Sequence, residues 1–139
     1  MVFRFSIFAL LATALLSTGC ASGRLSQPLD ERLVGNWEGL REEGSACQFL
    51  AWKSAFRADG SFEIIFFRDQ ARTQLIQAER GIWTAANGRS ELKTEGVGQP
   101  EVYLYTFHGP DTVHYENTVK DPSADCQADY QFTERRVAQ

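Results

Sequence analysis

Hydrophobic and polar residues alternate along most of the chain after residue 33, and this period of two predicts β-strands with one buried face. The alternation is clearest in two segments, 61–68 and 126–135. A slip of one residue would turn the whole apolar set toward water, so we expect the register to be firm. In these segments we predict that Phe62, Ile64, Phe66, Tyr130 and Phe132 point inward, and that Glu63 and Gln131 point outward.

Turn residues divide the patterned region into about eight strands. Asp59-Gly60 and Asn87-Gly88 are strong hairpin signals because a type I′ turn needs positive φ at both central residues, and Gly109-Pro110-Asp111 makes a third turn. Before the first strand, residues 29–33 can form one helical turn. The predicted strands are 33–40, 47–57, 61–68, 73–84, 89–95, 101–108, 112–118 and 126–135. Consecutive hairpins favour an all-β, antiparallel up-and-down barrel over a Greek-key sandwich.

The first nineteen residues have a different pattern. Arg4 precedes an apolar run over residues 5–16, and the small residues 17–19 follow it. This is the layout of a secretory signal peptide, and the apolar run is shorter than the roughly 20 residues that a membrane-spanning helix needs. We therefore predict a signal peptide at 1–19, a linker at 20–30 and one folded domain at 31–139.

Cys20 directly follows the small residues, and the pair Gly19-Cys20 resembles the lipobox of bacterial lipoproteins. The resemblance implies cleavage before Cys20 and acylation of this residue, including attachment of a fatty acid such as palmitate. Ala21, in place of the Asp that retains such proteins at the inner membrane, implies an outer-membrane lipoprotein that faces the periplasm. Ser17 stands where the family usually has Leu, so cleavage after Ala21 and a soluble periplasmic protein are the alternative.

Charge argues against one class of partner. Cleavage before Cys20 would leave 120 of the 139 residues and would remove one of the 14 basic residues but none of the 18 acidic ones, so the net charge would change from −4 to −5. This length suits a single domain. Because the domain is mildly acidic and has no basic run, we expect no nucleic-acid partner.

Cys47 and Cys126 remain after Cys20 is assigned to lipid, and in an oxidising compartment two such residues most simply form a disulfide. They are separated by 79 positions, so the loop-entropy model gives a stabilisation on the order of 4 kcal/mol. A redox-active or metal-binding pair is the alternative, but the sequence has no Cys-x-x-Cys motif and no His adjacent to either residue.

The segment 33–39, Leu-Val-Gly-Asn-Trp-Glu-Gly, resembles the first strand of lipocalin and calycin barrels, while Asp-Gly-Ser-Phe at 59–62 and Gly-Ile-Trp at 81–83 are similar to small bacterial lipocalin-like domains. The resemblance implies that Trp37 closes one end of the barrel beneath an Arg of the last strand. Arg136 is preferred over Arg135 because it shares parity with the inward-facing aromatics. Gly35 would allow a bend and a close approach of another chain segment. We expect these roles to be structural.

Candidate chemistry is sparse. The chain has no Gly-x-Ser-x-Gly nucleophile motif and no glycine-rich phosphate loop. His108 and His114 flank the third turn but show no recognisable ligand spacing. The acidic residues between 121 and 129 lack the Gly and closing Glu of a calcium loop. We therefore predict a protein that is not an enzyme and needs no metal or cofactor.

Aromatic residues make up 12% of the chain, and either they fill the barrel or they line a cavity, because an eight-stranded barrel is either just filled or holds one small ligand. If Trp83 points inward, parity also brings Gln77 and Glu79 inward; a solvated, outward Glu79 is the alternative. The strand expected at 101–108 is apolar on both faces and cannot be oriented. The cavity candidates are Trp52, Phe56, Phe62, Ile64, Phe66, Glu79, Tyr115, Tyr130 and Phe132.

These patterns favour a lipid-anchored barrel that binds a small apolar ligand. The alternative is an inhibitor or protein-interaction barrel that acts through its surface or through the arm formed by residues 20–30. A hollow barrel would favour the first function, and a solid barrel would favour the second.

Overall fold

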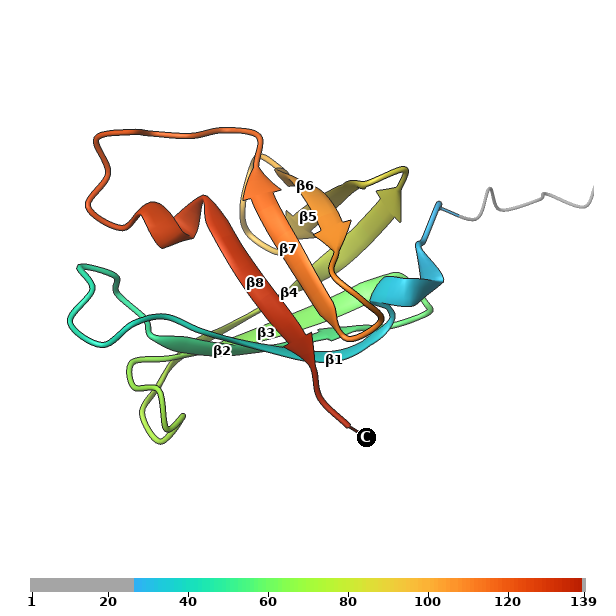
Figure 1. Ribbon diagram of the computed structural model, residues 1–139. Helices are drawn as coiled ribbons and strands as arrows, with labels where there is room; N and C mark the ends of the chain where they lie inside the picture. Colours follow the sequence, from blue (N-terminus) through green and yellow to red (C-terminus); the bar gives the residue numbers. More distant parts are fainter. Residues whose placement is uncertain (1–26, 139) are drawn as a thin grey trace, which may run out of the picture.

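The computed structural model describes residues 27–138, so the predicted signal peptide and Cys20 lie outside the described residues. Eight strands form a closed antiparallel barrel in which each strand pairs with the next and the last pairs with the first (Figure 1). The predicted all-β up-and-down barrel is therefore confirmed. The strands are β1 Gly35–Leu40, β2 Ala51–Phe56, β3 Ser61–Phe67, β4 Leu75–Ala86, β5 Arg89–Thr94, β6 Glu101–Phe107, β7 Thr112–Asn117 and β8 Gln131–Arg136.

The last strand begins later than the alternation predicted. Residues 127–129 form a 3-10 turn, η2 (Gln127–Asp129), and the backbone N–H of Tyr130 donates to the carbonyl of Gln127 at 3.0 Å. Tyr130 has helical dihedrals and ends this turn, so the strand predicted from residue 126 was wrong over its first five positions. The strand predicted from residue 47 likewise starts at Ala51, because residues 41–50 form a loop.

The two ends of the barrel differ. Short turns join β2 to β3, β4 to β5 and β6 to β7 at one end, and the 3-10 turn η1 (Glu31–Leu33) lies across it; we call this the closed end. Longer connections at 41–50, 68–74, 95–100 and 118–130 surround the opposite, open end. Figure 1 shows η1 and the loops 41–50 and 118–130 at opposite ends of the molecule.

Trp37 fills the closed end and is 0% exposed. Its Nε1–H donates to the carbonyl of Leu33 at 2.8 Å, and the Arg136 guanidinium lies 4.2 Å from the centre of its ring. Arg136 also donates to the carbonyls of Val34 and Arg32 at 3.0 and 2.6 Å, which ties β8 to the segment before β1. Gly35 has φ of +139°, and a Cβ there would lie 2.6 Å from Arg136 Nη1, so this position needs glycine.

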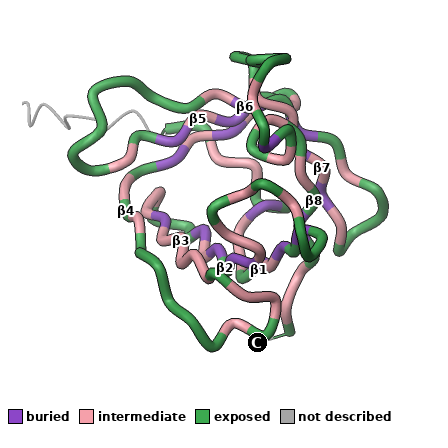
Figure 2. Tube along the Cα trace, turned by 90° about the vertical axis from the view of Figure 1, so that its left-hand side faces the viewer, coloured by how far each residue is buried: buried purple, intermediate pink, exposed green. Residues whose placement is uncertain are grey.

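Buried positions alternate with half-buried or exposed ones along β1, β6 and β7, and Figure 2 shows that most buried positions lie on the strands. Tyr103 and Tyr105 of β6 face inward and are buried, while Leu104 between them is 51% exposed. This orients the strand that the sequence left open.

Phe62 belongs to the packed, closed half of the interior and is 1% exposed. Its partner across the β3–β4 pair is Gly81, and a Cβ on Gly81 would lie 2.8 Å from the Phe62 ring. Because Gly81 has no side chain, the Phe62 ring packs down against the sheet at that point. The prediction that Phe62 points inward is met, but Phe62 is not among the residues that line the cavity described next, so that part of the prediction was wrong.

Candidate ligand cavity

The open half of the barrel contains a cavity of about 330 Å³. Eight of the nine candidates named from the sequence line it: Trp52, Phe56, Ile64, Phe66, Glu79, Tyr115, Tyr130 and Phe132. Glu79 pairs with Ile64 across the β3–β4 ladder and lies on the inward face, as does Gln77 opposite Phe66, so the outward alternative for Glu79 does not hold.

Aromatic rings form much of the cavity wall. Phe132 stacks on Tyr115 with ring centres 5.1 Å apart, and Trp52 meets Phe132 edge to face at 5.5 Å. Phe49, from the 41–50 loop, packs 4.6 Å from Phe66 at the open end. Rings in such mutual contact have little freedom, so this part of the wall is stiff and apolar.

Glu134 of β8 is a buried carboxyl in this wall and is 2% exposed. Its Oε1 accepts hydrogen bonds from Trp52 Nε1 at 2.7 Å and from Ser54 Oγ at 2.5 Å. Its Oε2 has no hydrogen-bond partner among residues 27–138. Burial raises the pKa of Glu134, and the two donors only partly oppose that shift.

Two tyrosines add polar atoms to the same interior. The Tyr115 hydroxyl is buried and has no hydrogen-bond partner within the described part of the chain. Burial, and then the nearby Glu134, raise the pKa of Tyr115 well above its usual value. Burial and Glu101 likewise raise the pKa of Tyr103. Both phenols therefore stay protonated and neutral; Tyr103 bonds the Glu101 carboxyl, while the Tyr115 hydroxyl keeps a donor without a partner among the described residues.

Two further carboxyl groups, those of Glu79 and Glu101, line the cavity near its open end. Gln77 Nε2 donates to Glu79 Oε1 at 2.8 Å and fixes that side chain. Partial withdrawal from water, and then repulsion by Glu79, raise the pKa of Glu101, which the Tyr103 hydroxyl partly opposes. Glu79 and Glu101 thus form an acidic pair, in which repulsion by Glu79 disfavours the charged form of Glu101.

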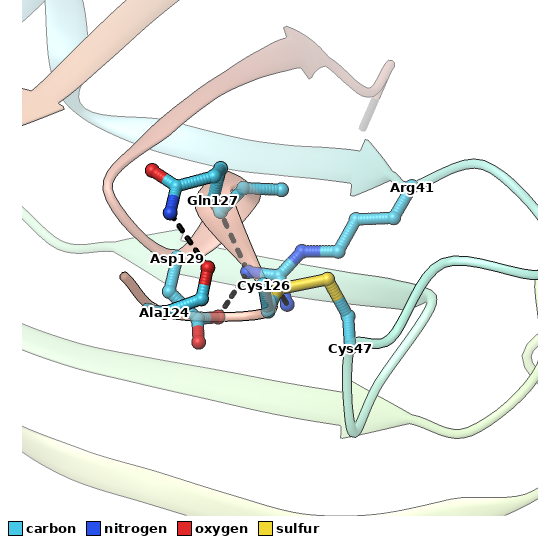
Figure 3. Close-up of a disulfide and its surroundings, with 7 residues drawn as sticks. Arg41, Cys47, Ala124, Cys126, Gln127 and Asp129 are labelled. Carbon is cyan, nitrogen blue, oxygen red and sulfur yellow. Dashed lines mark hydrogen bonds and ion pairs between the residues drawn. A yellow bond between two sulfur atoms is a disulfide. The ribbon is translucent and has the colours of Figure 1, made fainter. Parts of the chain in front are cut away.

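Arg41 is the one basic side chain among the described residues that line the cavity. Its guanidinium forms an ion pair with Asp129 at 2.8 Å, donates to the carbonyl of Ala128 at 3.1 Å and lies 3.8 Å from the centre of the Phe49 ring. It also approaches Cys126 Sγ at 3.3 Å (Figure 3). Burial lowers the pKa of Arg41, but these partners satisfy its charge within the protein.

A disulfide joins Cys47 to Cys126, as predicted, with the two Cα atoms 4.9 Å apart. It connects the loop 41–50 to the segment that leads into η2, and Figure 3 shows Arg41 extending alongside it toward Asp129. The bond therefore fixes two of the connections that surround the open end, including the loop that carries Phe49.

Sequence reasoning missed several cavity residues, of which Glu134, Arg41, Phe49 and Tyr103 matter most here. Glu134 had a readable signal, because it shares the parity of Phe132 on β8 and is an acid on the inward face. Arg41 and Phe49 lie in a loop without alternation, so no periodic pattern marks them.

Other site types find little support among residues 27–138. No group of three or more His, Cys, Asp or Glu side chains there could hold a metal ion, and the rings of His108 and His114 lie 6.5 Å apart at the closed end. None of the helices described is long and apolar enough to cross a membrane. Comparison of the chain with protein-family models and with curated proteins found no match.

Proposed function

We propose that this protein binds one small, largely apolar molecule inside the barrel. The observation that supports this function is the cavity of about 330 Å³ behind an aromatic wall. Ligand pockets usually measure roughly 300–1,000 Å³ and combine apolar walls with a few polar groups, so this cavity suits a ligand at the small end of that range. A hollow interior favours ligand binding over an inhibitor that works through its surface or N-terminal arm.

We further propose that the barrel is held at the outer membrane, on the periplasmic side, by acylated Cys20. The Gly19-Cys20 pair supports this, and so does the disulfide, which suits an oxidising compartment. The chain enters the barrel through η1 at the closed end, so a tether attached there would leave the open end unobstructed (Figure 1).

Enlarging Ile64 tests whether the cavity is the binding site. Ile64 lines the cavity, so Ile64→Trp should occupy ligand space and lower the affinity for a neutral apolar dye, N-phenyl-1-naphthylamine, by at least ~10-fold. Because the new ring enters empty space, the free energy of unfolding should change by less than the roughly 1–3 kcal/mol that overpacking costs. Dye fluorescence and urea denaturation measure the two effects.

Ile65→Trp is the matched control, since Ile65 is the next residue of β3 and lies on the opposite face beside Lys53 and Ala78. It should leave dye affinity within about twofold of the parent. Equal loss of affinity in both variants, or a large loss of stability in Ile64→Trp without loss of binding, would count against a ligand cavity. Native mass spectrometry of protein from its own cells would reveal a retained ligand.

Cys20→Ala tests the membrane attachment separately. Without the acylated residue the protein should move from the membrane fraction to the soluble periplasmic fraction. The double loss of the other two cysteines, Cys47→Ala with Cys126→Ala, is the control and should leave fractionation unchanged. A Cys20→Ala protein that still sediments with membranes would exclude lipidation as the attachment.

A further inference from the structure

Two buried polar atoms in the cavity wall lack partners within the protein. Glu134 is 2% exposed and Tyr115 is 4% exposed, both line the cavity, and neither Glu134 Oε2 nor the Tyr115 hydroxyl has a hydrogen-bond partner among the described residues. Leaving such an atom unmatched costs free energy, and nearly all buried polar groups in proteins are matched. An unmatched acceptor and an unmatched phenol in one cavity therefore indicate where the polar part of a ligand would bind.

The charges around the cavity favour a cation. Four carboxyl groups line it, those of Glu79, Glu101, Asp129 and Glu134, and Arg41 is the single basic group among the described lining residues. Arg41 is already paired with Asp129 and bonded to the carbonyl of Ala128. Three carboxyl groups are thus left without a cation in the lining, and one of them, Glu134, is fully buried.

The aromatic wall suits the same kind of ligand. The Phe132 ring contacts both Trp52 and Tyr115, and Trp52 Nε1 donates to Glu134 Oε1 at 2.7 Å. A cation held near aromatic faces gains additional attraction, and the gain increases where water is excluded.

Given the proposed function, we infer that the ligand is an organic amine with an apolar body, and that its ammonium group binds Glu134 while its body packs against the aromatic wall. The ammonium would supply the donor that Glu134 Oε2 lacks and would stabilise the ionised carboxylate, which burial alone disfavours. A carboxylate ligand, such as a fatty acid, would bring a like charge toward Glu134 and would find Arg41 already occupied. A neutral alcohol would leave the negative charges of the cavity uncompensated.

Three probes of matched shape test the chemical class: 4-phenylbutylamine, 4-phenylbutan-1-ol and 4-phenylbutyrate. Calorimetric titration of the parent protein should show the amine binding ~10- to 100-fold more tightly than the alcohol, because a hydrogen bond between two charged groups is stronger than a neutral one. The carboxylate should bind most weakly. This ranking needs no variant, so it stands even if a substitution in the cavity impairs folding.

Glu134→Gln tests the assigned partner. The amide oxygen can still accept from Trp52 Nε1 and Ser54 Oγ, while the amide NH₂ replaces the acceptor that the ammonium would use. The amine should lose ~10-fold or more in affinity while the alcohol changes by less than about threefold. Glu63→Gln is the matched control, because Glu63 is an outward carboxylate of β3 that pairs with Arg80 at 2.8 Å; it should leave all three affinities unchanged.

Glu79→Gln with Glu101→Gln separates Glu134 from the acidic pair at the open end. This double variant should weaken the amine by only about two- to fivefold, since those charges are nearer to water. If the amine preference survives Glu134→Gln and disappears in the double variant, the assignment to Glu134 is overturned.

The outcomes also separate this inference from the function on which it rests. Binding of the alcohol and of N-phenyl-1-naphthylamine without any preference for the amine, or a preference for 4-phenylbutyrate, overturns the amine assignment and leaves a ligand-binding barrel. Absence of binding by all three probes and by the dye overturns the proposed function itself.

Discussion

Trp37→Ala should lower the free energy of unfolding by about 3–5 kcal/mol, the usual cost of removing a fully buried large aromatic side chain. Trp37 is 0% exposed and fills the closed end between η1 and Arg136. The substitution would leave a void, strand the carbonyl of Leu33 without its donor, and remove the ring beneath the Arg136 guanidinium. Urea denaturation followed by circular dichroism measures the loss.

Trp37→Phe is the graded control. It keeps most of the apolar volume but cannot donate to Leu33, so it should cost less than the alanine variant by at least about 1 kcal/mol. Loss of the cation–π contact alone would account for only about 0.5–2 kcal/mol. If Trp37→Ala lowers the free energy of unfolding by no more than Trp37→Phe does, the buried aromatic ring does not stabilise the closed end. The cavity lies in the open half of the barrel, at the opposite end from η1, so dye affinity should persist in whatever fraction remains folded.

The closed end illustrates which structural features can be predicted from the sequence. Strict alternation and Asp-Gly and Asn-Gly turns specify local geometry, and consecutive hairpins leave few ways to close eight strands other than the observed barrel. The resemblance of the first strand implied an Arg over Trp37, and parity with the inward aromatics selected Arg136, which does lie over that ring. These features depend on residues a few positions apart, or on register that the hairpins propagate.

Features that depend on tertiary contacts were harder to predict from the sequence. Phe62 has the parity of Ile64 and Phe66, yet it packs over Gly81 of the next strand, and only the cross-strand partner distinguishes packed core from cavity wall. Tyr103 and Leu104 are both large and apolar, so alternation could not choose between them. Tyr105, of the same face as Tyr103, donates to Asp30 at 2.9 Å, a contact across 75 positions that no local pattern encodes.

The acidic character of the cavity was only partly predicted, because parity brought Glu79 inward while Glu134 was missed although it shares the parity of Phe132. Glu134 lies between Phe132 and Arg136 on the inward face of β8, where an apolar residue would normally be expected. A buried carboxyl in a small barrel reduces stability unless something compensates it. Its presence at a position that burial disfavours supports the ligand recognition proposed above.

Removing the disulfide should have an effect of similar size to Trp37→Ala. Cys47→Ala combined with Cys126→Ala should lower the free energy of unfolding by about 4 kcal/mol, because the bond spans 79 positions and restricts most of the unfolded domain. Treating the parent protein with dithiothreitol should produce the same loss, and the reduced parent and the double variant should unfold at the same urea concentration. A thiol titration of the unfolded, unreduced parent should find neither Cys47 nor Cys126 free.

The same double variant should also weaken ligand binding in the cavity. Measuring both effects separates the disulfide's action on the unfolded chain from its action on the folded cavity. The disulfide holds the loop that carries Phe49 against the segment that carries Asp129, with Arg41 between them (Figure 3). If it acted only on the unfolded chain, the folded double variant would bind N-phenyl-1-naphthylamine as the parent does. Because Phe49 lines the cavity, we expect weaker dye binding below the unfolding transition as well. Unchanged affinity together with a 4 kcal/mol loss would confine the bond's role to stability.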